Sequence, residues 1–151
     1  MSAGALIDTN VLAYSYDTGE PHKREQAMSI VARLAGTGQA ALTTQVLGEH
    51  HWVIRRRFTR RFTAAEAAEQ TAALSRAFPV YDTTLTVVLE ALRGTVRYQM
   101  PYYDAQIWAV ARVNHIPLVL SEDFSDGAVI EGVRFADPFA DGFDLEACLG
   151  A

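Results

Sequence analysis

Short apolar runs alternate along this sequence with longer segments of helical periodicity. Each run is too short and too uniformly apolar for a half-exposed strand, and this pattern is typical of strands buried on both faces of a parallel sheet. Strands that alternate with helices indicate an α/β domain of three layers, with a central, mainly parallel sheet flanked by helices. The expected strands are residues 4–8, 40–43, 79–81, 117–120 and 133–135.

The segments between these runs carry helix signals. Pro21 suits the first position of a helix, and Thr63 with Glu66 three residues later forms a capping-box pattern. We expect Thr9 and Asn10 to cap a short helix that starts directly after them. The longer helices are expected at 21–36, from 44 to the basic stretch 55–61, and at 63–77, 85–98 and 101–114.

Length and composition fit one compact domain over residues 1–151. Half of the residues are hydrophobic and 21% are charged, as in globular proteins. The one cysteine, Cys148, cannot form an internal disulfide, which favours a reducing compartment. The first residues lack the basic lead of a signal peptide, and no apolar stretch is long enough to span a bilayer. We therefore expect a cytoplasmic protein without membrane attachment.

Acidic residues follow two of the expected strands directly. Asp8 ends the first apolar run, and Asp123 follows the run 117–120. The carboxyl ends of parallel strands share one edge of a sheet, where ligands bind in α/β folds. These two acids are therefore expected to lie close together.

Two further acids occupy positions where an amphipathic helix has apolar residues. Glu49 is spaced by three and four residues from Val46 and Val53, and Asp104 shares a helix face with Ile107. Both acids are expected to point inward, near the edge that carries the strand-end acids. Each acid also has a simpler interpretation, because Asp8 and Asp123 could cap helices or turns, and Glu49 and Asp104 could pair with buried arginines.

Four neighbouring carboxylates need a compensating cation. Like charges raise one another's pKa, and burial opposes ionisation. An all-oxygen donor set suits Mg²⁺ or Mn²⁺, which can orient a phosphodiester and activate a bound water without a serine, cysteine or histidine nucleophile. The net charge of −5 argues at first against a nucleic-acid ligand. If these four acids and Asp126 share a metal site, the remaining acids balance the 13 basic residues.

The stretches around these acids resemble PIN-domain ribonucleases, and among them VapC-type toxins of type II toxin-antitoxin systems. The resemblance implies a PIN fold and assigns the four metal-site acids to Asp8, Glu49, Asp104 and Asp123, with Asp126 as an accessory metal ligand. It also implies Mg²⁺- or Mn²⁺-dependent cleavage of RNA that leaves a 5′-phosphate and a 3′-hydroxyl, in a homodimer neutralised by a small antitoxin. The stretches that carry it are 6–12, 46–49, 103–107, 120–124, 130–133 and 137–139.

Small polar residues beside the acids also match the family. Thr9, Asn10 and Ser121 are expected to orient carboxylates or phosphate, with helix capping as the alternative for Thr9. The sequence departs from the family at Pro101, where relatives often carry serine. It departs again after Glu49, where His50 and His51 stand in place of an aromatic or aliphatic residue. We expect both histidines on the surface, although a ligating His50 would favour Mn²⁺ or Zn²⁺.

Five arginines lie within seven residues and are interleaved with Phe58 and Phe62. They could contact RNA phosphates, or they could be a solvated helix end over two buried phenylalanines. Trp52 and Trp108 are expected in the core or at a dimer interface. The arginines are Arg55, Arg56, Arg57, Arg60 and Arg61.

Other functions place aspartates at strand ends too. Phosphorelay domains need a lysine beside the phosphate, but the only lysine is Lys23, in a helix before the second strand. Haloacid-dehalogenase phosphatases need an aspartate two residues after Asp8, where Asn10 stands. The alternatives left open are a PIN-like nuclease for DNA or structured nucleic acid, and a catalytically idle PIN interaction module.

Overall fold

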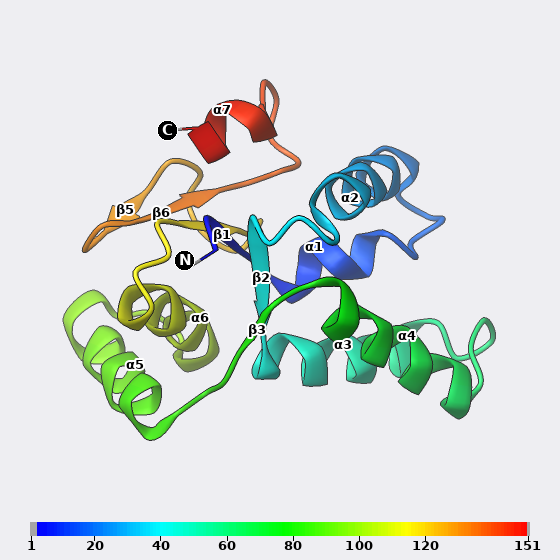
Figure 1. The fold of residues 1–151 in the computed structure, drawn as a ribbon, viewed down its shortest axis with the longest axis horizontal. Coiled ribbons are helices and arrows are strands. Elements are labelled where there is room, and N and C mark those ends of the chain that lie inside the picture. The colour runs from blue at the N-terminus through cyan, green and yellow to red at the C-terminus, as the bar shows by residue number, and fades with distance from the viewer. Residues whose placement is uncertain (1–2, 151) are drawn as a thin grey trace.

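A central sheet of six strands organises the protein (Figure 1), which a computed structural model describes over residues 3–150. The strand order is β3-β2-β1-β4-β6-β5, and only the β5–β6 pair is antiparallel among the described strands. The predicted mainly parallel α/β sheet is confirmed. The strands are β1 (Ala5–Ile7), β2 (Ala40–Thr43), β3 (Val80–Tyr81), β4 (Leu118–Leu120), β5 (Val129–Ile130) and β6 (Val133–Ala136).

Helices flank this sheet in two groups. Figure 1 shows α5 and α6 together on one side of the central strands, while α1, α2, α3 and α4 gather on the other. Among the described residues, no helix is long and apolar enough to cross a membrane. The helices are α1 (Thr9–Tyr14), α2 (Pro21–Leu34), α3 (Thr44–Arg57), α4 (Ala64–Ala77), α5 (Leu85–Tyr98), α6 (Tyr102–Val113) and α7 (Leu145–Gly150).

The central strands β1 and β4 pair in parallel and end side by side. Ile7 lies opposite Leu120 in the register, and the backbone N–H of Asp8 donates to the carbonyl of Leu120 over 2.9 Å. The residues that follow both strands therefore emerge at the same edge of the sheet, as the sequence predicts.

The core is densest where α6 lies against the sheet and α5. Every residue from Ala105 to Ala111 is buried, and the Trp108 indole N–H donates to the carbonyl of Ile130 over 3.1 Å. A glycine lets α5 approach this ring, because a Cβ at Gly94 would stand 2.7 Å from the Trp108 side chain. Trp108 is therefore a core residue, one of the two predicted environments.

Several local expectations are wrong. Asp8 itself is the N-cap of α1, because its carboxylate accepts the Thr9 N–H, so the predicted cap at Thr9 and Asn10 lies one residue late. Helix α3, by contrast, ends at Arg57, within the basic stretch that the sequence predicts as its end. The chain turns there, and the Arg55 guanidinium donates to the carbonyl of Phe62. Strand β5 and helix α7 were not predicted, since each is too short to show a periodicity.

Candidate active site

Asp8 lies at the centre of the carboxylate cluster. Its Oδ1 accepts the Thr9 backbone N–H and its Oδ2 accepts the Ser121 hydroxyl, both over 2.7 Å. Its exposed fraction is only 9%. Burial raises the pKa of Asp8 to about 6 in spite of these hydrogen bonds, and the negative charges of Asp123 and Glu49 raise it further. Asp8 thus caps α1, and its carboxylate also has a raised pKa.

Glu49 reaches the same place from α3. The Thr9 hydroxyl donates to Glu49 Oε2 over 3.0 Å, and the Gln45 side-chain amide donates to Oε1. Thr9 therefore links the first helix to the third, with its N–H on Asp8 and its hydroxyl on Glu49. Gln45 was not identified from the sequence, although its position four residues before Glu49 on one helix face was the available signal.

Asp104 belongs to the same electrostatic group. It stands in the first turn of α6 and is half-buried. Burial raises the pKa of Asp104, and the charges of Asp123 and Glu49 add to this effect. The structure thus couples Asp104 electrostatically to Asp123, which follows β4, and to Glu49 on α3.

Asp123 is positioned by a hydroxyl at the end of β4. The Ser121 oxygen accepts the Asp123 backbone N–H over 3.1 Å and the Asn10 side-chain amide over 3.2 Å. The Asn10 carbonyl oxygen in turn accepts the backbone N–H of Glu122 over 3.4 Å. Ser121 is fully buried, so these bonds fix the loop that carries Asp123 against the start of α1.

A clamp that the sequence did not reveal holds this loop from outside. The Lys23 ammonium on α2 donates to Glu122 Oε2 over 2.9 Å and contacts the Tyr14 hydroxyl at 3.3 Å. The Tyr14 hydroxyl donates to Glu122 Oε1 over 2.7 Å. The only lysine of the chain is therefore committed to Glu122, one residue before Asp123.

The four acids have no basic partner within the part of the chain that the structure describes. None of Asp8, Glu49, Asp104 and Asp123 forms an ion pair within 4.0 Å of a lysine, arginine or histidine among residues 3–150. The alternative in which buried arginines neutralise Glu49 and Asp104 is therefore wrong. Burial and the charges of Glu49 and Asp123 raise the pKa of Asp8 and of Asp104 instead.

This donor set fits a hard divalent cation. All of its ligating atoms are oxygens, and Gln45 adds a buried Oε1 that accepts no hydrogen bond. Within residues 3–150, no three histidine, cysteine, aspartate or glutamate side chains already converge as a complete metal-binding group. Mutual repulsion of four negative groups opposes such convergence, and a bound cation removes that repulsion.

Asp126 lies apart from this group. Its Oδ1 accepts the backbone N–H of Asp137, the residue after β6, over 2.9 Å. It is exposed, and its charge is not among the causes that raise the pKa of Asp8 or Asp104. A metal-binding role for Asp126 stays a prediction.

Of the two histidines after Glu49, His50 differs from the expected surface position, whereas His51 is partly exposed. His50 is fully buried, with Nδ1 at 2.8 Å from the Thr71 hydroxyl and Nε2 at 3.2 Å from the Tyr16 hydroxyl. Burial, with a smaller effect of His51, lowers the pKa of His50 to about 4. His50 is thus a neutral buried residue between α4 and the turn that follows α1, and the expected surface position is wrong because Thr71 and Tyr16 pack on its face of α3.

The five arginines divide by their contacts. Arg55 and Arg61 donate to the backbone carbonyls of Phe62 and Tyr16, and Arg57 pairs with Asp17. Within residues 3–150, Arg56 and Arg60 have no such polar partner. The half-buried Phe58 and Phe62 pack around the Tyr16 ring instead of entering the main core.

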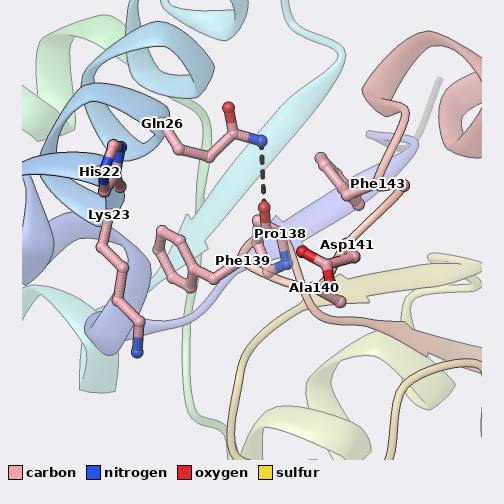
Figure 2. A pocket seen from close by; sticks show the side chains of 9 residues that line it. His22, Lys23, Gln26, Pro138, Phe139, Ala140, Asp141 and Phe143 are labelled. Atoms are coloured by element: carbon pink, nitrogen blue, oxygen red, sulfur yellow. Dashed lines mark hydrogen bonds between the residues drawn. The ribbon is translucent and has the colours of Figure 1, made fainter.

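A cavity of about 280 Å³ opens elsewhere, between α2 and the segment 138–143. Figure 2 shows His22, Lys23 and Gln26 on one side of it and Phe139 on the other, with the Gln26 amide donating to the carbonyl of Pro138. None of the four clustered acids lines this cavity. The candidate site is therefore the open acidic edge of the sheet and not this cavity.

Comparisons with known proteins agree with this geometry. A family model described as the PIN domain matches residues 5–125. A search of curated proteins finds no match. Among solved structures, VapC20 of Mycobacterium tuberculosis, described as a sarcin-ricin loop cleaving toxin, is 25% identical, with a TM-score of 0.64 over 86% of this chain and 98% of that chain.

Two toxin-antitoxin structures share the fold at lower identity. A toxin-antitoxin complex from Klebsiella pneumoniae is 19% identical, with a TM-score of 0.64 over 89% of this chain and 98% of that chain. A DNA-bound VapBC from Salmonella typhimurium is 17% identical, with a TM-score of 0.60 over 91% of this chain and 99% of that chain.

Proposed function

Because this chain belongs to the PIN-domain family, we propose that it is a Mg²⁺- or Mn²⁺-dependent endoribonuclease, the toxin of a toxin-antitoxin pair. One observation carries the proposal: burial and the charges of Glu49 and Asp123 raise the pKa of Asp8 and of Asp104, and none of these four acids, which come from separate elements, has a basic partner among the described residues. Perturbed acids gathered in this way are typical of catalytic sites. The matching toxin from Mycobacterium tuberculosis supports RNA as the substrate class.

Asp8, Glu49, Asp104 and Asp123 would hold the metal. When bound, the cation supplies charge neutralisation at the phosphate and lowers the pKa of a water molecule. The other polar residues keep the carboxylates in place: Ser121 donates to Asp8, and Thr9 donates to Glu49. We propose products with a 5′-phosphate and a 3′-hydroxyl, as the resemblance to PIN-domain ribonucleases implies.

Manganese calorimetry and a cleavage assay test this proposal together. We expect wild-type protein to bind Mn²⁺ and to cut a single-stranded RNA in Mg²⁺ or Mn²⁺, and EDTA to abolish cutting. Asp104→Asn should lose cleavage and weaken metal binding, because a neutral amide is a poorer ligand than a carboxylate. Asp141→Asn, at an exposed acid outside the cluster, is the matched control.

The same assay separates the alternative functions. Protein that binds no Mn²⁺ and cuts no nucleic acid would be an idle interaction module. Faster cutting of DNA than of RNA of the same sequence would assign a DNA-directed nuclease. Either result overturns the proposed ribonuclease.

Two partners belong to this proposal. The toxin-antitoxin complexes with the same fold support a small antitoxin as one partner. Homodimerisation is supported by an apolar stripe on α5, whose spacing of four, three and four residues places it on one helix face. Burying exposed apolar surface of this kind favours association. The stripe is formed by the exposed residues Leu85, Leu89, Leu92 and Val96.

A further inference from the structure

The exposed tryptophan on α3 is the starting point. Trp52 has an exposed fraction of 59%, so of its two predicted environments the core is wrong, while a place at a dimer interface stays a prediction. The Arg56 guanidinium lies over its ring, with Cζ at 4.8 Å from the ring centroid. This contact leaves much of the indole surface open to solvent.

Trp52 and Arg56 lie on the same side of α3 as Glu49, further along the helix. An α-helix turns by about 100° per residue, so Arg56, seven residues after Glu49, points within about 20° of it. Trp52, three residues after Glu49, points about 60° away on the same side. At a rise of 1.5 Å per residue, Arg56 stands about 10 Å along the helix axis from Glu49. The pair therefore lies beside the carboxylate cluster, and not behind it.

The neighbouring arginines are occupied elsewhere. Arg55, Arg57 and Arg61 are held by backbone carbonyls or by Asp17, as described above. Within residues 3–150, the Arg56 guanidinium has no hydrogen-bond or ion-pair partner, and its one cation–π contact is with the Trp52 ring. Its positive charge is available to a phosphate while the stacked ring limits the freedom of the guanidinium.

We propose that Trp52 and Arg56 form a nucleotide subsite, in which the indole stacks on a base of single-stranded RNA and the guanidinium binds an adjacent phosphate. The inference rests on the proposed ribonuclease function and names how the strand is held beside the acids. Aromatic rings bind unpaired bases through their faces, and an arginine next to them binds the backbone. A positive group also offsets the repulsion between the phosphates and the acidic edge.

Intrinsic fluorescence tests this subsite directly. Trp108 is fully buried, so Trp52 is the tryptophan that a ligand can reach. We titrate the protein in EDTA, where no metal-dependent cleavage occurs, with a ten-nucleotide oligouridylate and with an abasic ten-mer of equal charge. We expect quenching by the oligouridylate, little quenching by the abasic strand, and no such signal in Trp52→Phe.

Affinity measurements by fluorescence polarisation separate stacking from charge. Trp52→Ala should weaken oligouridylate binding roughly 5- to 100-fold, the range typical of one base stack, with Trp52→Phe in between. Arg56→Gln should lower the slope of log affinity against log salt by about 0.7, the value for one phosphate contact on a single strand. Trp52→Ala should leave that slope unchanged. Met28→Ala removes a comparably exposed apolar side chain on α2 and serves as the control.

Three results would overturn the subsite: equal quenching by the abasic strand, unchanged affinity in Trp52→Ala, or a change of oligomeric mass in Trp52→Ala during sedimentation. The last result would assign Trp52 to a contact between protein chains. The subsite proposal and the ribonuclease proposal can fail independently of each other. Wild-type protein that cuts RNA with the same KM as Trp52→Ala refutes the subsite alone, whereas base-dependent quenching without any cleavage refutes the nuclease and supports the subsite.

Discussion

Replacement of Asp8 by asparagine should stabilise the metal-free protein at neutral pH. The pKa of Asp8 is about 6 in the folded chain, against an ordinary value of 3.8. The folded state therefore binds this proton more tightly than the unfolded state does. Ionised Asp8 costs stability above pH 6, and the cost falls away as the pH drops through 6 toward 3.8. A difference of roughly two pKa units corresponds to about 3 kcal/mol.

Asparagine does not recover all of this free energy. Its oxygen can still accept the Thr9 N–H, but its amide nitrogen replaces the oxygen that accepts from Ser121. That nitrogen also lies near the Asn10 amide, which is 3.5 Å from Asp8 Oδ2. A lost hydrogen bond costs about 1 kcal/mol. We expect a net gain of about 1–2 kcal/mol at pH 7.5, or an increase in Tm of roughly 2–8 °C.

Urea unfolding in EDTA at pH 7.5, 5 and 4 measures this gain, with Asp141→Asn as the control. The gain should shrink as the pH falls, vanish between roughly pH 4.5 and 5.5, and become a small loss at pH 4, where the missing hydrogen bond outweighs the remaining cost of ionised Asp8. Added Mg²⁺ should stabilise wild-type protein more than Asp8→Asn, since a ligand that binds only the folded state raises its stability. Metal-free Asp8→Asn that unfolds more easily than wild type at pH 7.5, or a gain that does not change with pH, would refute electrostatic repulsion and burial as the dominant cause.

Three further predictions follow from the packing and the buried groups. Gly94→Ala should destabilise the protein by about 1–3 kcal/mol in urea unfolding, because its Cβ would meet the Trp108 ring at 2.7 Å. Gly48→Ala, on a helix with no atom within 4 Å of the added Cβ, should instead be neutral or stabilising by up to about 1 kcal/mol, and equal effects at both glycines would contradict the packing argument. Because the pKa of His50 is lowered to about 4, His50 should reduce the stability by up to about 3 kcal/mol between pH 6.5 and 4, which opposes the gain from Asp8 protonation over the same range, and His50→Gln should gain stability relative to wild type as the pH falls in the same measurement. Leu89→Glu should shift sedimentation from dimer to monomer if the α5 stripe is the dimer contact, and an unchanged mass would place the contact elsewhere.

The sequence predicted the fold well where the chemistry is repetitive. Apolar runs located the strands that carry Asp8 and Ser121, because burial on both faces leaves an uninterrupted pattern. The inward positions of Glu49 and Asp104 were predicted from helical spacing, and in the structure the charges of Glu49 and Asp123 both act on Asp104. These inferences depend on local periodicity, which a single sequence contains.

Side-chain environments that depend on tertiary packing were harder to predict. His50 is buried because α4 and the turn after α1 both pack on its face of α3, and Trp52 is exposed because no described element covers it. Neither outcome follows from residue type. The clamp of Lys23 on Glu122 joins residues 99 positions apart, a contact that no local pattern encodes.

The Ser121 hydroxyl has one proton, which it donates to Asp8. Its oxygen accepts two hydrogen bonds, from the Asn10 side-chain amide and from the Asp123 backbone N–H. Its donor and acceptor capacities are used at once and in a fixed direction. Threonine could reproduce this polarity, whereas alanine would release two loops together and asparagine would present the wrong donor. We therefore expect evolutionary drift at this position to be confined to the two hydroxyl amino acids, even in relatives whose surrounding surface has diverged.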